Sequence, residues 1–380
     1  MGYERFIPAG EALRTKYRNQ FPVIRQMVYL NHASVAPLCQ SAADAMKHLA
    51  DDALTYGSLH YSHWLDAYEG LRVAAAKLIH ADRSEIAIVK NTSEGIATVA
   101  LGIDWKPGDR MVVFREEFPA NYLPWKRLES RGVKLEILSY DEDLTRIDEA
   151  AKGARLLAIS YVQYLSGYRA DLEGIGEICE RRGVFFFVDA IQGLGAFPLD
   201  VRKARIHALA ADGHKWLLGP EGCGILYIQR DQQDSIQPVE FGWTNIAAFN
   251  DYSCRDMTLR EDAGRYECGT LNTIGCYGLR ASTEFLLEAG IEEIGQAVQA
   301  LGDQVAEGVQ EKGYELLGSR TPATGAGIVS FRKAGMDARM IVRQLRDAGF
   351  MAAPRQGWIR VSPHFYISPG EIGGLIAELP

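Results

Sequence analysis

The sequence has few cysteines, no long apolar run and no excess of basic residues. Its six cysteines, at positions 39, 179, 223, 254, 268 and 276, include no pair with C-x-x-C spacing, which argues against a disulfide scaffold or a zinc module. The longest apolar stretch, residues 184–199, contains Asp189 and Gln192 and is shorter than the ~20 apolar residues that span a bilayer. Residues 1–20 are charged and lack the apolar segment of a secretory signal. These absences predict a cytoplasmic protein without a membrane partner.

The charge balance and the missing motifs narrow the ligand class. The 380 residues include 41 basic and 49 acidic side chains, for a formal net charge of −8, whereas nucleic-acid binding needs a basic face. No P-loop motif occurs, residues 193–195 lack the third glycine of a dinucleotide fingerprint, and His60 and His63 lie outside any HExxH motif. We therefore expect a small-molecule ligand, no nucleic acid and no metal.

Short apolar runs alternate with longer amphipathic stretches. The predicted strands are 86–89, 110–114, 134–139, 156–162, 184–190, 208–211 and 224–228. Continuous apolar runs such as VFFFVDA are typical of strands covered on both faces. The segments between them fit helices, for example 172–182, which Gly183 should end. The pattern predicts an α/β protein with a mainly parallel seven-stranded sheet between helices.

The pattern changes after residue 237. Residues 237–258 are aromatic and irregular, a long helix is expected over 279–289, and strands are expected at 327–331, 349–353 and 358–361. We predict a large α/β domain over 26–250, a smaller α+β domain over 251–380, and an N-terminal segment, 1–25, packed on the smaller domain.

Three polar groups should meet at one rim of the sheet, because functional side chains gather at the carboxyl ends of parallel strands. Asp189 ends one strand, Lys215 follows the next, and residues 91–95 follow a third and open a helix. A phosphorylated pyridine aldehyde would use all three: the helix N-terminus for phosphate, Asp189 for the ring nitrogen and Lys215 for a Schiff base. Taken singly, each has an ordinary alternative as a helix cap, a turn residue or a solvated lysine.

Ordered motifs along nearly the whole chain, from about Tyr29 to about Tyr366, strengthen this interpretation. They are YLNHASVAP (29–37), NTSEGI (91–96), EFPANYLPW (117–125), SYVQYLSGYRADL (160–172), VDAIQ (188–192), DGHKWLLGPEGCGILY (212–227), YECGTLNTIG (266–275) and IRVSPHFY (359–366). With them the sequence resembles the class V aminotransferase family of fold-type I enzymes dependent on pyridoxal 5′-phosphate (PLP). That family includes cysteine desulfurases, selenocysteine lyases and isopenicillin N epimerase-like proteins.

The resemblance implies roles for individual residues. Lys215 would bind PLP and move protons, and Asp189 and Gln192 would contact the ring nitrogen and the ring oxygen. The phosphate ligands would be Thr92, Ser93, His214 and, from the neighbouring subunit of a homodimer, Thr270. Arg360 would hold the substrate carboxylate. The substrate pocket would also include Asn31, His32 and Tyr164.

Four positions depart from the desulfurase pattern. Phe118 stands where desulfurases stack a histidine on the ring, and Tyr164 stands where they have an asparagine that contacts the cofactor. The stretch GFMAAPRQGWIR, before Arg360, has no nucleophilic cysteine, unless Cys254 or Cys268 reaches the site by another route. Asp212 replaces a phosphate-binding serine, and we expect it to turn away from phosphate or to pair with His214.

The expected activity is Cα deprotonation of a small amino acid by Lys215, with transamination as the first choice. The alternatives are a C–S lyase that lacks the usual cysteine and an amino-acid epimerase. From other classes, a binding protein without turnover would be expected to have lost Lys215, Asp189 or Arg360, and a nicotinamide-dependent dehydrogenase would need a GxGxxG turn that is missing here.

Overall fold

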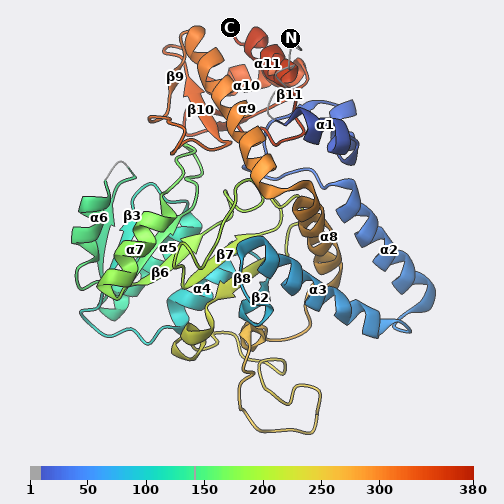
Figure 1. The fold of residues 1–380 in the computed structure, drawn as a ribbon, viewed down its shortest axis with the longest axis vertical. Helices are drawn as coiled ribbons and strands as arrows, with labels where there is room; N and C mark the ends of the chain where they lie inside the picture. The colour runs from blue at the N-terminus through green and yellow to red at the C-terminus, as the bar shows by residue number, and fades with distance from the viewer. Residues whose placement is uncertain (1–9, 141–142) are drawn as a thin grey trace, which may run out of the picture.

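The computed structural model describes residues 10–140 and 143–380, and a seven-stranded sheet lies at its centre (Figure 1). The strand order is β2-β8-β7-β6-β5-β3-β4, and only β8 runs antiparallel to its neighbours. The strands are β2 (Ile86–Val89), β3 (Arg110–Phe114), β4 (Lys134–Leu138), β5 (Leu156–Ser160), β6 (Phe185–Asp189), β7 (Ala208–Asp212) and β8 (Gly224–Ile228). The predicted α/β class is confirmed, and every predicted strand of this sheet is present within about two residues of its expected ends.

The sheet is buried on both faces because successive side chains point to opposite sides of each strand. In β6, for example, Phe186 and Val188 belong to one apolar core and Phe187 to the other. Helices α4 (Thr92–Gly102) and α5 (Leu123–Arg127) cover the second face. The first face is covered by α3 (Tyr61–Ile79), α6 (Leu144–Ala151), α7 (Leu172–Arg182) and α8 (Thr273–Ala289).

Residues 291–380 form a smaller layer above this sheet in Figure 1. Its antiparallel sheet has the order β12-β13-β10-β9, and the strands are β9 (Glu315–Leu316), β10 (Val329–Arg332), β12 (Ala353–Arg355) and β13 (Trp358–Val361). The helices are α9 (Ile291–Glu311), α10 (Ala338–Asp347) and α11 (Pro369–Glu378). The strand expected at 349–353 is split between β11 (Phe350–Met351) and β12.

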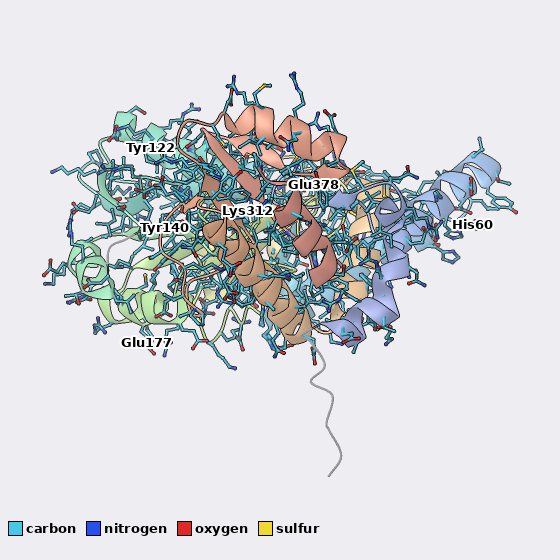
Figure 2. All side chains as sticks on the ribbon, turned by 90° about the horizontal axis from the view of Figure 1, so that it is seen from above. His60, Tyr122, Tyr140, Glu177, Lys312 and Glu378 are labelled. Atoms are coloured by element: carbon cyan, nitrogen blue, oxygen red, sulfur yellow. The ribbon has the colours of Figure 1, made fainter. Side chains whose placement is uncertain are left out.

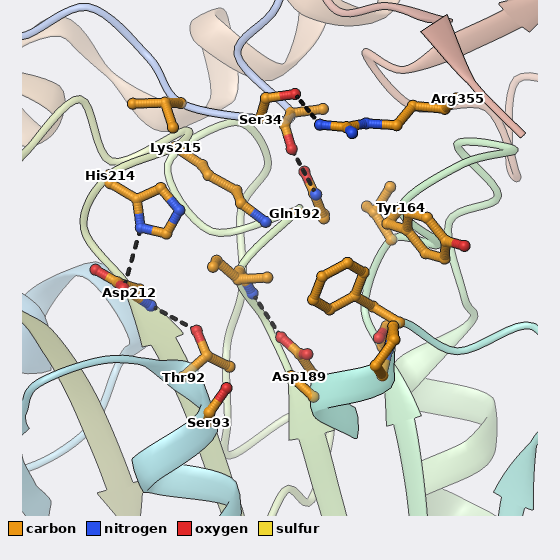
Figure 3. A pocket seen from close by; sticks show the side chains of 18 of the residues that line it. Ser34, Thr92, Ser93, Tyr164, Asp189, Gln192, Asp212, His214, Lys215 and Arg355 are labelled. Atoms are coloured by element: carbon orange, nitrogen blue, oxygen red, sulfur yellow. Dashed lines mark hydrogen bonds and ion pairs between the residues drawn. The ribbon is translucent and has the colours of Figure 1, made fainter. Parts of the chain in front are cut away.

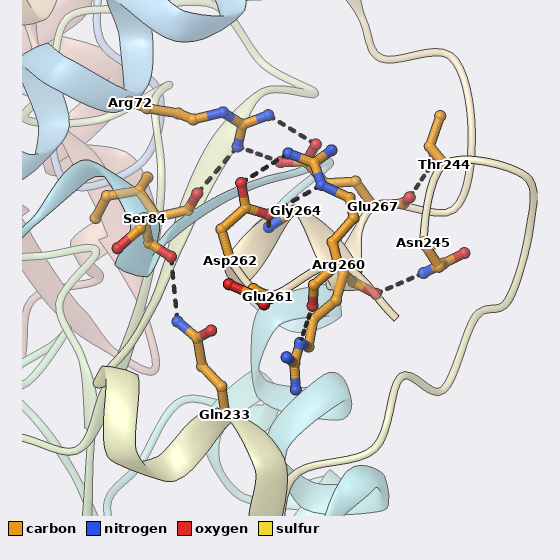
Figure 4. Close-up of polar contacts among 12 residues, drawn as sticks. Arg72, Ser84, Gln233, Thr244, Asn245, Arg260, Glu261, Asp262, Gly264 and Glu267 are labelled. Atoms are coloured by element: carbon orange, nitrogen blue, oxygen red, sulfur yellow. Dashed lines mark hydrogen bonds and ion pairs between the residues drawn. The ribbon is translucent and has the colours of Figure 1, made fainter. Parts of the chain in front are cut away.

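Residues beyond the expected domain boundary at 250/251 pack against the large domain. Glu267 accepts two hydrogen bonds from Arg72 of α3, at 2.5 and 2.8 Å (Figure 4). It also accepts one from the amide of Ile88 in β2. Helix α8 packs against α2 (Gln40–Tyr56) and α3. It begins at Thr273, earlier than expected, because the side chain of Asn272 caps its first turn. We therefore propose that the large domain extends to about residue 290.

The N-terminal segment is tied to the end of the chain. Strand β1 (Val28–Tyr29) pairs in parallel with β11, and Arg18, just after α1 (Glu11–Tyr17), binds Glu371 through both guanidinium NH groups at 2.9 and 2.6 Å. The packing of the N-terminal segment on the smaller domain stays a proposal: Arg18 contacts α11, but Tyr17 also donates to Glu288 of α8 at 3.1 Å. Because residues 28–29 pair with the smaller domain, we propose that the large domain begins after them, whereas the expected start is residue 26.

The described residues give no support to two other kinds of site. None of their helices is long and apolar enough to cross a membrane. No cluster of three or more metal-ligating side chains occurs in residues 10–140 and 143–380. His60 lies at the tip of the projecting α2–α3 hairpin (Figure 2), where its Nδ1 is 2.7 Å from Asp52. This contact with Asp52 explains the position of the His60 side chain without a metal.

Candidate active site

A cavity of about 630 Å³ lies at the carboxyl ends of the sheet strands, below the β12–β13 hairpin (Figure 3). Strand ends and the loops after them supply most of its wall, as the topology of a parallel sheet requires. The cavity brings together nine of the predicted site residues, namely Thr92, Ser93, Phe118, Tyr164, Asp189, Gln192, His214, Lys215 and Arg360. It also includes Ser34, Asp212, Arg355 and Gln356.

Lys215 and Asp189 form the centre of the cavity. The Lys215 amine points into the open space in Figure 3, and no hydrogen-bond partner holds it among the described residues. Burial lowers the pKa of this amine to about 8, against the opposing effect of the Asp189 charge. Burial also raises the pKa of Asp189 to about 6, although the amide of Ile191 donates to the carboxylate at 3.1 Å. Both pKa shifts favour the neutral forms, because burial penalises a charge. A cationic group of a ligand placed beside Asp189 would therefore stabilise its carboxylate.

The N-terminus of α4 lies at one corner of the cavity. The Asn91 side chain caps the helix by accepting from the amide of Glu94, and Thr92 and Ser93, whose N–H groups have no partner within the helix, line the cavity. The Thr92 hydroxyl oxygen accepts a hydrogen bond from the amide of Asp212 at 3.0 Å. The Asp212 carboxylate lies 3.0 Å from His214 Nδ1. Pairing with His214 is one of the two arrangements expected for Asp212, which stands where the desulfurases have serine.

Aromatic rings form one wall of the cavity. Phe118 is 46% exposed in this structure, its ring centroid lies 5.3 Å from that of Tyr164, and the Lys215 amine lies 5.7 Å from it. A large apolar face open to a polar cavity is suited to covering a planar ligand. Glu117, which sequence reasoning missed, lies behind this wall and accepts hydrogen bonds from Tyr140 and Ser160. Burial raises the pKa of Glu117 to about 7.

Gln192 is fixed at the floor of the cavity. Its amide NH₂ donates to the carbonyl of Ala33 at 3.0 Å, and its amide oxygen accepts from the Trp216 indole at 3.0 Å. One N–H of the amide remains for a ligand. The orientation of Gln192 is therefore set before a ligand binds.

The upper wall contains two arginines. Arg360 is 2% exposed, donates to the carbonyl of Tyr164 at 2.7 Å and to the Ser34 hydroxyl at 2.6 Å, and has a buried Nε without a partner among the described residues. Arg355 donates to the same hydroxyl at 3.1 Å. Arg355, Ser34 and Gln356 were not predicted as site residues, although Gln356-Gly357 before the apolar residues Trp358 and Ile359 is consistent with a two-residue hairpin turn.

Three predicted site residues lie elsewhere. His32 is fully buried between the carbonyl of Ser362 and the hydroxyl of Tyr366, at 2.8 Å from each. Asn31 lies under Ser34 and accepts its hydroxyl proton at 2.8 Å, so the segment 33–35 lines the cavity in place of 31–32. Thr270 is exposed and lies outside the cavity of its own chain.

No cysteine is among the described residues that line the cavity. Cys223 and Cys276 are buried, with their sulfurs 3.9 Å apart. Cys254 and Cys268 are partly exposed, and the Cys268 thiol donates to Glu240 at 3.3 Å. Neither Cys254 nor Cys268 reaches the Lys215 cavity within one chain.

The donor set fits PLP. A primary amine of lowered pKa, a buried carboxylate and a helix N-terminus face one cavity, and these groups complement an aldehyde, a pyridine nitrogen and a phosphate. Arg360 Nε is a buried donor of the lining without a hydrogen-bond partner among the described residues, so it is available to an anionic group.

Comparison with known proteins agrees with this chemistry. The sequence profile described as Aminotransferase class-V matches residues 28–359, so the chain belongs to the class V aminotransferase family. It is a PLP-dependent enzyme, as predicted from the sequence. A probable cysteine desulfurase of Methanothermobacter thermautotrophicus is 32% identical over 93% of this chain and 94% of that protein.

Two solved structures share the whole fold. A cysteine desulfurase of Thermococcus onnurineus, in its apo form, has a TM-score of 0.88 at 28% identity and covers 96% of each chain. The cystine C–S lyase C-DES, in complex with its product cysteine persulfide, has a TM-score of 0.87 at 25% identity, over 94% of this chain and 98% of that one. These similarities confirm the expected fold type.

Proposed function

We propose that this enzyme is a C–S lyase that acts on cysteine-derived amino acids and does not carry sulfur on an enzyme thiol. The observation that carries the proposal is the cavity around Lys215, which no cysteine of the described residues lines. Similarity to proteins named cysteine desulfurase, and to a cystine C–S lyase, supports a sulfur-containing substrate.

Several groups of the cavity would hold the cofactor. The α4 N-terminus, Thr92, Ser93 and His214 would hold the phosphate, Gln192 would bind the ring oxygen, and Phe118 would pack on the ring. Asp189 would keep a proton on the ring nitrogen, and this positive charge would offset the cost of burying the carboxylate. When bound, PLP supplies an electron sink for the negative charge that develops at Cα.

Arg360 and Lys215 would act on the amino acid. Arg360 binds the α-carboxylate, with Tyr164 beside it. The Lys215 amine, whose pKa near 8 suits a base at neutral pH, accepts the Cα proton. The Cα–H electron pair forms a Cα–Cβ double bond and the Cβ–S bond breaks, with its electron pair leaving on sulfur. Water then completes the reaction, and the products are a thiol or persulfide, pyruvate and ammonium.

We further propose a homodimer in which Thr270 of each chain faces the phosphate of the other. Thr270 is exposed and lies outside its own cavity, just before the cap of α8. A shared site would require that the active protein be a dimer. Sedimentation of the PLP-loaded protein tests this, and a fully active monomer would contradict it.

The reaction type is tested by product analysis. The PLP-loaded protein is incubated with L-cystine, S-methyl-L-cysteine or L-cysteine, and pyruvate, ammonia, alanine and sulfide are quantified. Equal amounts of pyruvate and ammonia from cystine, with no alanine, are expected. Alanine together with sulfide from cysteine would instead identify a desulfurase and overturn the proposal.

Transamination is the second candidate, and the family description favours it. It would convert the cofactor to its amino form in one stoichiometric turnover, until a keto acid is added. The same assay separates the two reactions, since a lyase continues without an acceptor whereas an aminotransferase stops after one equivalent.

A further inference from the structure

Two guanidinium groups share one hydroxyl above the Lys215 amine. Ser34 Oγ donates its only proton to Asn31 Oδ1 at 2.8 Å. Its lone pairs therefore face the arginines, and Arg360 Nη2 and Arg355 Nη2 donate to it at 2.6 and 3.1 Å. Ser34 holds two positive charges side by side at the same wall of the cavity.

The hairpin fixes where Arg355 lies. Strands β12 and β13 are joined by Gln356 and Gly357, whose φ angles of 49° and 84° are left-handed, as in a type I′ turn. The Gln356 side chain donates to the Tyr164 hydroxyl at 2.8 Å and secures the tip of the hairpin across the cavity.

The two charges have no acidic partner. Among residues 10–140 and 143–380, neither Arg355 nor Arg360 forms an ion pair, and their nearest shared acceptor is the neutral Ser34. Burial, followed by the charge of Arg355, lowers the pKa of Arg360 to about 10. One carboxylate at Arg360 would compensate one charge, and Arg355 would remain available for a second anion.

We propose that Arg355 and Arg360, bridged by Ser34, form a site for two anions. Arg360 holds the α-carboxylate, and Arg355 holds a second anionic group carried by the sulfur substituent. This inference rests on the proposed C–S lyase function and names its substrate class: cysteine derivatives with an acidic S-substituent, of which cystine, with its second carboxylate, is one.

A matched pair of substrates tests the second anion. S-carboxymethyl-L-cysteine and S-carbamoylmethyl-L-cysteine have nearly the same shape and differ by one negative charge. For the wild-type enzyme we expect kcat/KM to be roughly 10- to 100-fold higher for the acid, the range of a charge-assisted hydrogen bond. Arg355→Gln should reduce this ratio to within about threefold of one. Arg343→Gln, which changes an exposed arginine of α10 outside the cavity, is the control and should keep the wild-type ratio.

Two results would overturn the inference. Equal wild-type kcat/KM for both compounds would show that no second anion is recognised. If Arg355→Gln lowers kcat/KM equally for both compounds, Arg355 binds the α-carboxylate together with Arg360 and no second anion. If neither compound releases pyruvate, the proposed function fails. The second-anion site is then tested by calorimetric binding of the same pair to the PLP-loaded protein, where the acid should still bind roughly tenfold more tightly.

Discussion

The two halves of the cavity are built in different ways. The cofactor half comes from the ends of neighbouring strands and the loops after them, with Asp189 and Lys215 only 26 positions apart (215 − 189). The substrate half joins Ser34 to Arg355 and Arg360, which lie 321 and 326 positions away along the chain. A single sheet therefore fixes the cofactor groups, whereas the substrate groups depend on docking between distant segments. Variants should be able to disable either half alone.

The largest effect is expected from Lys215→Ala, which removes the amine of the cofactor half. Activity should fall by a factor of roughly 10³ or more, because both the attachment of PLP and the base are lost. The visible absorbance of the loaded protein should also change. Lys203→Ala, an exposed lysine outside the cavity, is the control. A Lys215→Ala variant with the wild-type spectrum would contradict the assignment.

Arg360→Gln should disable only the substrate half. KM for amino acids should rise by roughly 100-fold, since a buried charge-assisted pair is lost, while PLP should bind as in the wild type. Titration of the apoprotein with PLP, followed by absorbance, checks the second point. Loss of PLP binding in this variant would show that the halves are not separable.

The pH dependence of PLP uptake tests the cofactor half without any amino-acid substrate. Only the neutral Lys215 amine attacks an aldehyde, and burial brings its pKa down from 10.5 to about 8. The second-order rate of PLP uptake by the apoprotein should therefore rise about fivefold from pH 7 to pH 8 and level off near pH 9. Stopped-flow absorbance measures it. A rate that keeps rising tenfold per pH unit up to pH 10 would contradict a lowered pKa.

The smallest effect is expected from Ser34→Ala at the joint between the halves. KM should rise by about threefold to tenfold, because both arginines lose one acceptor. The value of kcat should change less, as Ser34 acts by positioning the arginines, and Ser34→Thr should restore KM. A fall in kcat with no change in KM would argue against this role.

Much of the cofactor half could be predicted from the sequence, and the substrate half only partly. Continuous apolar runs such as residues 185–189 mark buried strands, and the polar residues that follow them must lie at one rim. Arg355 and Ser34 were missed because their contact depends on pairing between the two ends of the chain. Asn31 and His32 were predicted to line the cavity, but residues 33–35 line it instead. The irregular backbone after β1 has no periodicity that would show which residues face the cavity.

The pairing of Ser34 with Arg355 and Arg360 also has a consequence for synthesis. A chain made from its N-terminus has every strand of the central sheet by residue 228 but both arginines only near its end. Closing a loop of more than 300 residues comes late, whereas contacts between neighbouring strands are local. We expect a nascent chain to be able to take up PLP before it can hold an amino acid. Visible absorbance of bound PLP would then show that the central sheet has formed. Binding of an amino acid would show that the C-terminal strands have also docked.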